Sequence, residues 1–275
     1  MSEKADISIL GCGWLGLPLA ETLVNSGKRV KGSTTSPAKL EILEQKGIQP
    51  YLVNLQPEAV DEMALADFLE ADVLVLNIPP KLRSDGGSNY LEQLNLLLKA
   101  MLDSPVKKVL FASSTSVYND LNRIVTEEDT ALTKESDPGY ALLRAEKLFM
   151  DREEWLTTIV RFAGLVGEDR RPGRFMAGKK DVPGGDAPVN LIHREDCVLI
   201  LKRIIEQEKW GEIYNACSDV HPMRKDFYPA ATMALDLEPP TFLEMAETNF
   251  KLISNQKLKD DLPYVFQYPD PMHFF

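Results

Sequence analysis

The chain has 275 residues, 44% of them hydrophobic, which is enough apolar material for one large core or for two closely joined lobes. Its formal net charge of −11 is spread along the chain, so neither nucleic acid nor an anionic membrane is an expected partner. Cys12, Cys197 and Cys217 form no C-x-x-C pair, so we expect no metal site. The charged N-terminus does not fit a signal peptide, and the apolar runs are too short for a membrane span. We therefore expect a cytoplasmic protein.

Short apolar runs alternate with amphipathic stretches through the first two-thirds of the chain. Runs of near-continuous apolar residues indicate strands that are buried on both faces, which is typical of a parallel sheet covered by helices. The sequence therefore predicts an α/β, doubly wound parallel sheet of the Rossmann type. The expected strands are 7–10, 51–55, 72–78 and 107–111, and the expected helices are 15–26, 60–69, 90–102 and 140–150.

The composition changes after Arg161, where glycine and proline become frequent. A loop-rich stretch at 167–188 is followed by a further strand, helix and strand, which we expect to return to the sheet. The proline-containing tail predicts a separate lobe. We therefore predict a large nucleotide-type domain from 1–166 and 189–217, and a small interleaved C-terminal substrate lobe from 167–188 and 218–275.

A glycine loop follows the first expected strand. "GCGWLG" places Gly11, Gly13 and Gly16 in a G-x-G-x-x-G pattern between strand and helix, with Trp14 and Leu15 enclosed. Such glycines allow a tight turn, a close backbone approach to a pyrophosphate and close packing of the helix, whose N-terminus favours an anion. The pattern predicts dinucleotide binding by these five residues, and a merely structural glycine turn is the alternative.

The strand that follows the first helix, at the start of "VKGSTTSPAKL", should end in residues that contact the adenosine ribose of such a cofactor. An acidic residue there favours NAD, because a carboxylate binds the 2′-hydroxyl and repels a 2′-phosphate. The sequence instead offers hydroxyls, with Thr34 and Thr35 among them, and Lys39 adds positive charge. We therefore expect NAD or NADP with NADP favoured, although these hydroxyls serve equally well as a cap for the helix that starts at Pro37.

Six motifs in order resemble the atypical or extended short-chain dehydrogenases, the family that includes the NAD-dependent epimerase/dehydratases of nucleotide sugars. The resemblance spans nearly the whole chain and implies an NAD(P)-dependent oxidoreductase or epimerase that acts on a sugar-like or nucleotide-sugar substrate. The glycine loop alone also suits a 6-phosphogluconate-type dehydrogenase, but the hydroxyl-rich fifth strand favours the short-chain family. The motifs are "GCGWLG", "FASSTSVY", "IVRFAGLVGEDRRPGR", "VNLIHREDC", "GEIYNAC" and "KLISNQKLKDDLPYVFQYP".

The resemblance places Ser114 against the reacting oxygen of the substrate and assigns Ser113 to the cofactor side. A polar residue at the carboxyl end of a central strand also lies where open parallel sheets bind ligands. An ordinary strand exit is the alternative. The same resemblance assigns Asn54, Asn77 and Pro79 to cofactor binding.

The catalytic Y-x-x-x-K pair of the family has no full match. Tyr140 is followed four residues later by Arg144, which keeps the positive charge but does not lose its proton and so cannot relay one. Counting back from the Ala-Glu pair at 145–146 places Pro138 and Leu142 at the Tyr and Lys positions, which makes Tyr140 a packing residue. Tyr140 and Arg144 are therefore either the catalytic pair or a structural one.

We expect substrate contacts from Tyr118, Arg161, Arg174 and Asn190. Packing is the alternative for Tyr118, and solvated charge is the alternative for Arg174, which lies in the Gly/Pro-rich loop that would cover the cleft. A homodimer is expected from the resemblance alone. Arg161 has a buried ion pair as its alternative role, and His193 in "IHRED" is interpreted as a structural histidine. The competing class is a non-catalytic NAD(P)-binding regulator or assembly protein. The ending "YPDPMHFF" carries two phenylalanines that a partner or the fold itself must cover.

Overall fold

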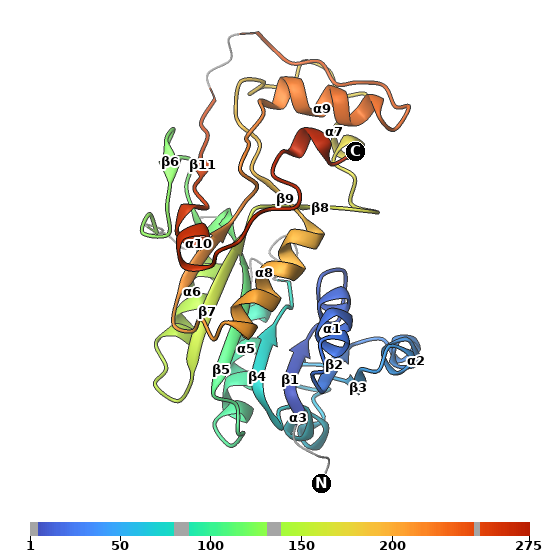
Figure 1. Ribbon diagram of the computed structural model, residues 1–275, viewed down its shortest axis with the longest axis vertical. Coiled ribbons are helices and arrows are strands. Elements are labelled where there is room, and N and C mark those ends of the chain that lie inside the picture. Colours follow the sequence, from blue (N-terminus) through green and yellow to red (C-terminus); the bar gives the residue numbers. More distant parts are fainter. Residues whose placement is uncertain (1–4, 80–87, 131–138, 245–247) are drawn as a thin grey trace. The chain divides into compact units, whose positions relative to one another are not determined.

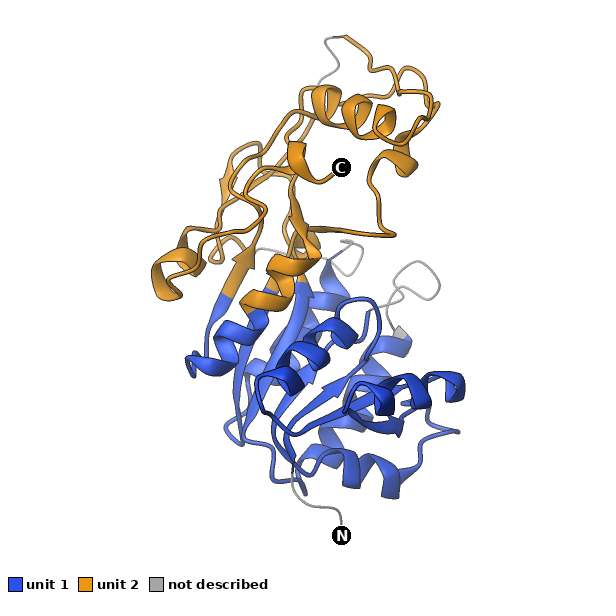
Figure 2. Cartoon of the chain, turned by 45° about the vertical axis from the view of Figure 1, so that its right-hand side comes forward, with its two compact units in different colours: residues 1–113, 132–160, 201–213 blue, residues 114–131, 161–200, 214–275 orange. Residues whose placement is uncertain are grey.

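The computed structural model describes residues 5–79, 88–130, 139–244 and 248–275. The chain divides into two compact units, coloured separately in Figure 2. Unit 1 holds residues 1–113, 132–160 and 201–213, and unit 2 holds residues 114–131, 161–200 and 214–275. The boundaries between the units fall inside three strands of one sheet, so they do not test the predicted domain bounds, which stay a prediction.

A seven-stranded sheet with the order β10-β7-β5-β4-β1-β2-β3 carries the fold (Figure 1). The pairings of β1 with β2, β1 with β4, β2 with β3 and β4 with β5 are parallel, and Ile7 is paired with Val30 on one side and Val73 on the other. The order 3-2-1-4-5 is that of a doubly wound fold, so the predicted α/β class is confirmed. The strands are β1 (Ala5–Leu10), β2 (Val30–Thr34), β3 (Gln49–Leu52), β4 (Ala71–Leu76), β5 (Lys108–Ser114), β7 (Leu156–Phe162) and β10 (Ile213–Ala216).

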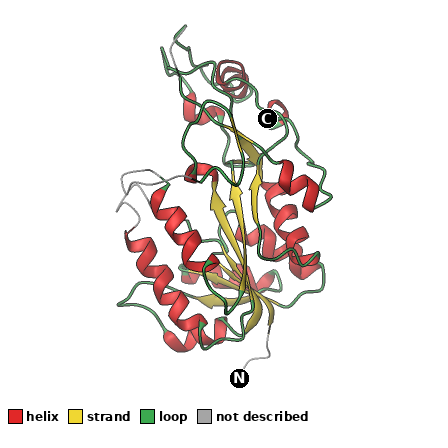
Figure 3. Ribbon diagram, turned by 90° about the vertical axis from the view of Figure 1, so that its left-hand side faces the viewer, coloured by secondary structure: helices red, strands yellow, loops and turns green. Residues whose placement is uncertain are grey.

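Helices cover both faces of this sheet (Figure 3). Helix α5 packs against both α3 and α6, while α1 packs against β1 and β2. The helices are α1 (Gly16–Asn25), α2 (Leu40–Gln45), α3 (Glu62–Phe68), α5 (Ser88–Met101), α6 (Tyr140–Met150) and α8 (Arg194–Glu206), with the 3-10 turns η1 (Pro37–Lys39) and η2 (Thr115–Val117).

The core of unit 1 follows from the spacing of its apolar residues. Leu15, Leu19 and Leu23 recur every four residues, and all three are buried, so α1 presents one apolar stripe to the sheet. Ile7 and Ile9 of β1 are buried at 1% and 0% exposure. Because burial on both faces removes water from the sheet, the continuous apolar runs noted in the sequence are explained.

Unit 2 contains two short parallel pairs and a small apolar cluster. Strand β6 (Ile124–Val125) pairs with β11 (Leu252–Ile253), and β8 (Gly164–Val166) pairs with β9 (Leu191–His193). The cluster consists of Val166, Val189, Leu191, Phe227 and Ala231. The remaining elements are α7 (Gly173–Met176), α9 (Arg224–Met233), α10 (Gln256–Asp261) and η3 (Pro271–His273).

In the part of the chain that the structure describes, no helix combines the length and the apolar character needed to cross a bilayer.

Candidate functional site

The glycine loop, residues 11–16, joins the end of β1 to the start of α1. Gly11 has a φ of +102°, a left-handed conformation that favours glycine. Its N–H donates to Ser33 Oγ at 2.9 Å, and the Cys12 N–H donates to the Ser33 carbonyl at 2.8 Å. Asn77, the residue that follows β4, donates from its side-chain amide to the Gly11 carbonyl at 2.9 Å. The loop is therefore held from both neighbouring strands.

The three glycines of the loop have different reasons to lack a side chain. A Cβ on Gly11 would lie 2.5 Å from the Asn77 carbonyl oxygen, and a Cβ on Gly16 would lie 2.2 Å from the Gly11 carbonyl oxygen. Both positions are thus required by packing. Gly13 differs, because it is exposed and a Cβ there would meet nothing within 4 Å. Its backbone is open to a group from outside the chain.

The loop lies at the point where the strand order reverses. Strands β2 and β3 extend from one side of β1, while β4 and β5 extend from the other. In open parallel sheets the crevice beyond the carboxyl ends of such strands binds ligands. Because Gly13 is open there and no side chain caps the N-terminus of α1, which begins at Gly16, the residues present fit a dinucleotide pyrophosphate.

The other predicted cofactor residues lie along strand ends. Trp14 is half-buried and Leu15, the N-cap position of α1, is buried, whereas Pro79 is exposed beyond β4. Thr34 Oγ1 accepts from the Ser36 N–H at 3.1 Å, and Thr35 is exposed at the end of β2. The exposed Asn54 accepts from the Gln56 N–H at 3.3 Å through its side chain. Their roles toward a cofactor stay predictions.

The hydroxyl residues Ser113 and Ser114 at the end of β5 differ in their burial. Ser113 is buried, and its hydroxyl donates to Glu146 Oε1 of α6 at 2.5 Å. Ser114 is half-buried and caps η2 by accepting from the Ser116 N–H at 3.2 Å. Ser113 thus fixes the strand to a helix, while the Ser114 side chain is partly accessible. Glu146 was not among the predicted site residues, because nothing in the sequence pairs it with a serine 33 positions earlier.

Tyr140 and Arg144 lie on one face of α6. Tyr140 is the first residue of the helix and is half-buried, and Arg144 is exposed. The Arg144 guanidinium carbon lies 5.9 Å from the centroid of the Tyr140 ring, as the i, i+4 spacing requires. Pro138, the residue of the alternative alignment, lies outside the described residues.

Tyr118 and Arg161 are parts of a buried network in unit 2. Arg161, 1% exposed, donates to the Tyr118 hydroxyl at 2.7 Å and to the Glu127 carbonyl at 3.2 Å. The Tyr118 hydroxyl in turn donates to Asn215 Oδ1 at 2.7 Å. Burial raises the pKa of Tyr118 to about 12, and the adjacent guanidinium only partly opposes this rise. Both side chains are engaged in the fold, so their predicted contact with substrate stays a prediction.

Two further predicted residues lie elsewhere in unit 2. The Asn190 amide donates to the Lys251 carbonyl at 2.8 Å, and its oxygen accepts from the Ile253 N–H at 2.9 Å, so it fastens β11. Arg174 is exposed on α7. His193 stacks on Tyr268 with ring centroids 3.8 Å apart, and burial lowers its pKa. Across the described residues, no group of three or more His, Cys, Asp or Glu side chains is arranged to hold a metal ion.

Comparison with known proteins relates the whole chain to others. It is 36% identical to protein YeeZ of Escherichia coli K12 over 97% of each chain, while no protein-family model matches. A structure from Methylobacillus flagellatus assigned to the NAD-dependent epimerase/dehydratases is 25% identical, with a TM-score of 0.75 over 99% of this chain and 96% of that one. MoeE5, solved with UDP-glucose and NAD, is 20% identical, with a TM-score of 0.75 over 95% of this chain and 93% of that one. The predicted resemblance to the short-chain dehydrogenases is confirmed in the fold.

Proposed function

Because the chain belongs to the family of Escherichia coli YeeZ and has the short-chain dehydrogenase fold, we propose that it is an NAD(P)-dependent oxidoreductase or epimerase acting on a sugar-like or nucleotide-sugar substrate. The glycine loop carries this proposal. Gly11 and Gly16 are required by packing, whereas Gly13 is open at the ligand-binding edge of the sheet. The UDP-glucose and NAD bound to MoeE5, a protein of the same fold, support the substrate class.

The chain's own groups suit a pyridine dinucleotide with a 2′-phosphate. The end of β2 offers the exposed Thr35 in place of an acidic residue, and Lys39 is exposed one turn further on. Neither residue repels a phosphate, which is why we favour NADP over NAD. When bound, the nicotinamide accepts or donates the hydride.

Three residues serve the proton transfer to and from the substrate in this proposal. Ser114 hydrogen-bonds the reacting oxygen of the substrate, and Tyr140 exchanges a proton with it. Arg144, which faces the Tyr140 ring, stabilises the tyrosinate by its charge. Since a guanidinium keeps its proton, it does not replace the lysine of the family as a relay, and we expect slower turnover than a Tyr/Lys pair gives.

The presence of Arg144 also favours a second candidate, a non-catalytic NAD(P)-binding regulator or assembly protein. Such a protein needs the glycine loop but not the proton donor. The two candidates differ in turnover, not in cofactor binding.

Cofactor binding is tested by calorimetric titration with NADP, NADPH, NAD and NADH. Gly13→Asp should abolish binding, because it introduces a carboxylate where the pyrophosphate approaches. The variant should fold normally, since the site is open and its φ is not left-handed, and an unchanged melting temperature checks this. Thr35→Glu should weaken NADP more than NAD. If the wild type binds none of the four, both candidates are wrong.

Catalysis is tested by turnover of UDP-glucose and related nucleotide sugars. Tyr140→Phe should lower kcat by at least ~100-fold, in line with the contribution of a general acid or base, with cofactor affinity unchanged. Ser114→Ala should lower kcat, while Ser116→Ala, an exposed hydroxyl two residues away, serves as its control. Cofactor binding without turnover in any direction favours the regulator.

We also propose a cytoplasmic homodimer. The three cysteines are free and buried, so the fold needs no oxidising compartment. Light scattering should give twice the chain mass of 30.9 kDa, and a single-chain mass would contradict the dimer.

A further inference from the structure

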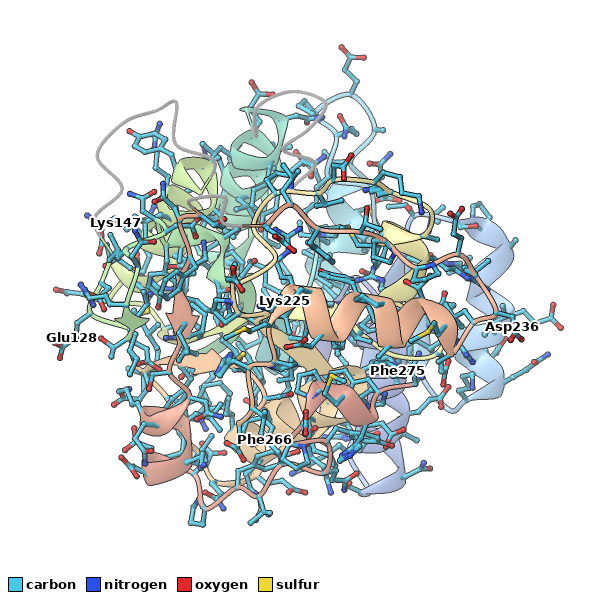
Figure 4. The ribbon with its side chains drawn as sticks, turned by 90° about the horizontal axis from the view of Figure 1, so that it is seen from above. Glu128, Lys147, Lys225, Asp236, Phe266 and Phe275 are labelled. Atoms are coloured by element: carbon cyan, nitrogen blue, oxygen red, sulfur yellow. The ribbon has the colours of Figure 1, made fainter. Side chains whose placement is uncertain are left out.

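The proposed function leaves the buried carboxylate of Glu146, in unit 1, without a role. The buried residues of α6 are Ala141, Leu142, Ala145, Glu146 and Phe149. Four of them are apolar, so Glu146 is the charged member of an otherwise apolar stripe. It is 2% exposed, whereas Lys147, the next residue, lies on the exposed side of the helix (Figure 4). Burying a carboxylate is unfavourable unless a partner satisfies it, and that partner is Ser113 of β5.

Two contacts show how α6 lies on β5. The Phe149 ring meets the Phe111 ring edge to face, with centroids 5.6 Å apart. One turn earlier in the helix and two residues later in the strand, Glu146 Oε1 accepts from the Ser113 hydroxyl at 2.5 Å. Alternate residues of a strand share a face, and residues three apart in a helix do so as well. The two elements therefore run in opposite directions along one line of contact.

This direction carries the first turn of α6 past the end of β5. The strand ends at Ser114, one residue after the contact with Glu146. Tyr140 begins the helix six residues before Glu146, which is about 9 Å further along the helix axis at the usual rise per residue. The carboxyl ends of parallel strands form the ligand-binding edge of such a sheet. The first turn of α6, with Tyr140 and Arg144, therefore projects at that edge.

Apolar packing alone does not fix this projection. Contact between apolar groups is non-directional, so a helix held only by Phe149 and its apolar neighbours shifts on the sheet at little cost. A hydrogen bond to a carboxylate is short and directional. The N-cap residue of α6 is Gly139, which has no side chain to fix the first turn instead. Buried polar groups set the register of packed helices in the same way.

We propose that Glu146 is a positioning residue, whose bond to Ser113 holds α6 in the register that places Tyr140 and Arg144 at the ligand-binding edge. The inference rests on the proposed function, in which these two residues serve the proton transfer. A misplacement of about 1 Å can cost an enzyme about 100-fold in rate, so loss of the bond should lower kcat at least ~tenfold. Cofactor affinity should not change, because β4 separates β5 from β1 and its glycine loop.

The test replaces both partners at once, in Ser113→Ala combined with Glu146→Met. Two apolar side chains then take the place of the buried pair, so the urea midpoint should stay the same or rise. The kcat on UDP-glucose, or on the related nucleotide sugar with the highest wild-type turnover, should nevertheless fall at least ~tenfold. Glu146→Gln keeps an oxygen that accepts from Ser113 and should retain most of the kcat.

Thr157→Val is a matched control on the same helix. The buried Thr157 hydroxyl donates to the Phe149 carbonyl at 3.0 Å, near the opposite end of α6 from Tyr140. The control also removes a buried hydrogen bond of α6, so it should lower the urea midpoint, but it should leave kcat unchanged. If Glu146 were merely structural, kcat would follow stability in every variant.

Several outcomes overturn the positioning role alone. One is a double variant with wild-type kcat, and another is Glu146→Gln losing as much kcat as the double variant. A third is reduced cofactor affinity with kcat unchanged, which would assign Ser113 to the cofactor. If the double variant does not fold, Ser113→Ala alone must lower kcat, and an unchanged kcat there overturns the role.

Failure of the proposed function gives a different result. A wild type that turns over no nucleotide sugar overturns the proposed function and the positioning role together. The outcomes that overturn the positioning role alone all require an active wild type, so the two failures are distinguishable.

Discussion

Replacing Tyr118 with phenylalanine removes one buried oxygen and tests whether this tyrosine belongs to the fold. Its hydroxyl accepts from Arg161 at 2.7 Å and donates to Asn215 at 2.7 Å. A hydrogen bond to a charged group contributes about 1.5–3 kcal/mol and a neutral one about 1 kcal/mol. Tyr118→Phe should therefore lower the free energy of unfolding by about 3 kcal/mol.

Tyr90→Phe provides the matched control. The Tyr90 hydroxyl is also buried, but it has no hydrogen-bond partner among the described residues. Removing it should leave stability unchanged or raise it by up to about 1 kcal/mol, because an unsatisfied buried hydroxyl is lost. Both variants remove the same atom from a buried tyrosine, so their difference isolates the hydrogen bonds.

Equilibrium urea unfolding measures both variants. Trp14, Trp155 and Trp210 all belong to unit 1, so tryptophan fluorescence reports that unit, and far-UV circular dichroism is needed to follow unit 2. Equal stability of the two variants would refute the reasoning. If Tyr118→Phe keeps its full stability but has a raised KM, the result would instead support the predicted contact of Tyr118 with the substrate.

Other variants and conditions extend these expectations. Gly16→Ala should lower the free energy of unfolding in urea by about 1–3 kcal/mol or more, because its Cβ would lie 2.2 Å from the Gly11 carbonyl oxygen. Gly13→Ala should lower it little, since the added Cβ meets nothing within 4 Å. Equal losses in the two variants would contradict this packing. Asp196→Asn should reduce hydrogen-exchange protection of residues 264–268, since its carboxylate accepts from the Tyr264 hydroxyl at 2.6 Å and from two backbone N–H groups; unchanged protection would argue against this anchor. Burial lowers the pKa of His193 and His221 below 6.5, so the unfolded chain takes up protons first. Their contribution to stability is therefore present above pH 6.5 and lost as the pH falls through the folded-state values, and His193→Gln should flatten the acid side of a pH–stability curve.

Local patterns in the sequence were sufficient for the fold class and the glycine loop. Continuous apolar runs specify strands buried on both faces, and the spacing of the glycines specifies a turn in which Gly11 and Gly16 leave no room for a side chain. These are relations between neighbouring residues, so Gly11, Gly13 and Gly16 were predicted in the turn where the structure has them. The i, i+4 pairing of Tyr140 with Arg144 is local in the same sense.

The partners of the other candidate side chains were decided only by the tertiary structure. Tyr118 meets Asn215 across 97 positions, and Asn190 holds Lys251 across 61. A sequence shows that such a residue is polar, but not whether a distant segment buries it and satisfies its hydrogen bonds. Because a buried polar group must find a partner wherever the packed chain provides one, long-range packing determines which of these residues the fold engages and which it leaves accessible to a ligand.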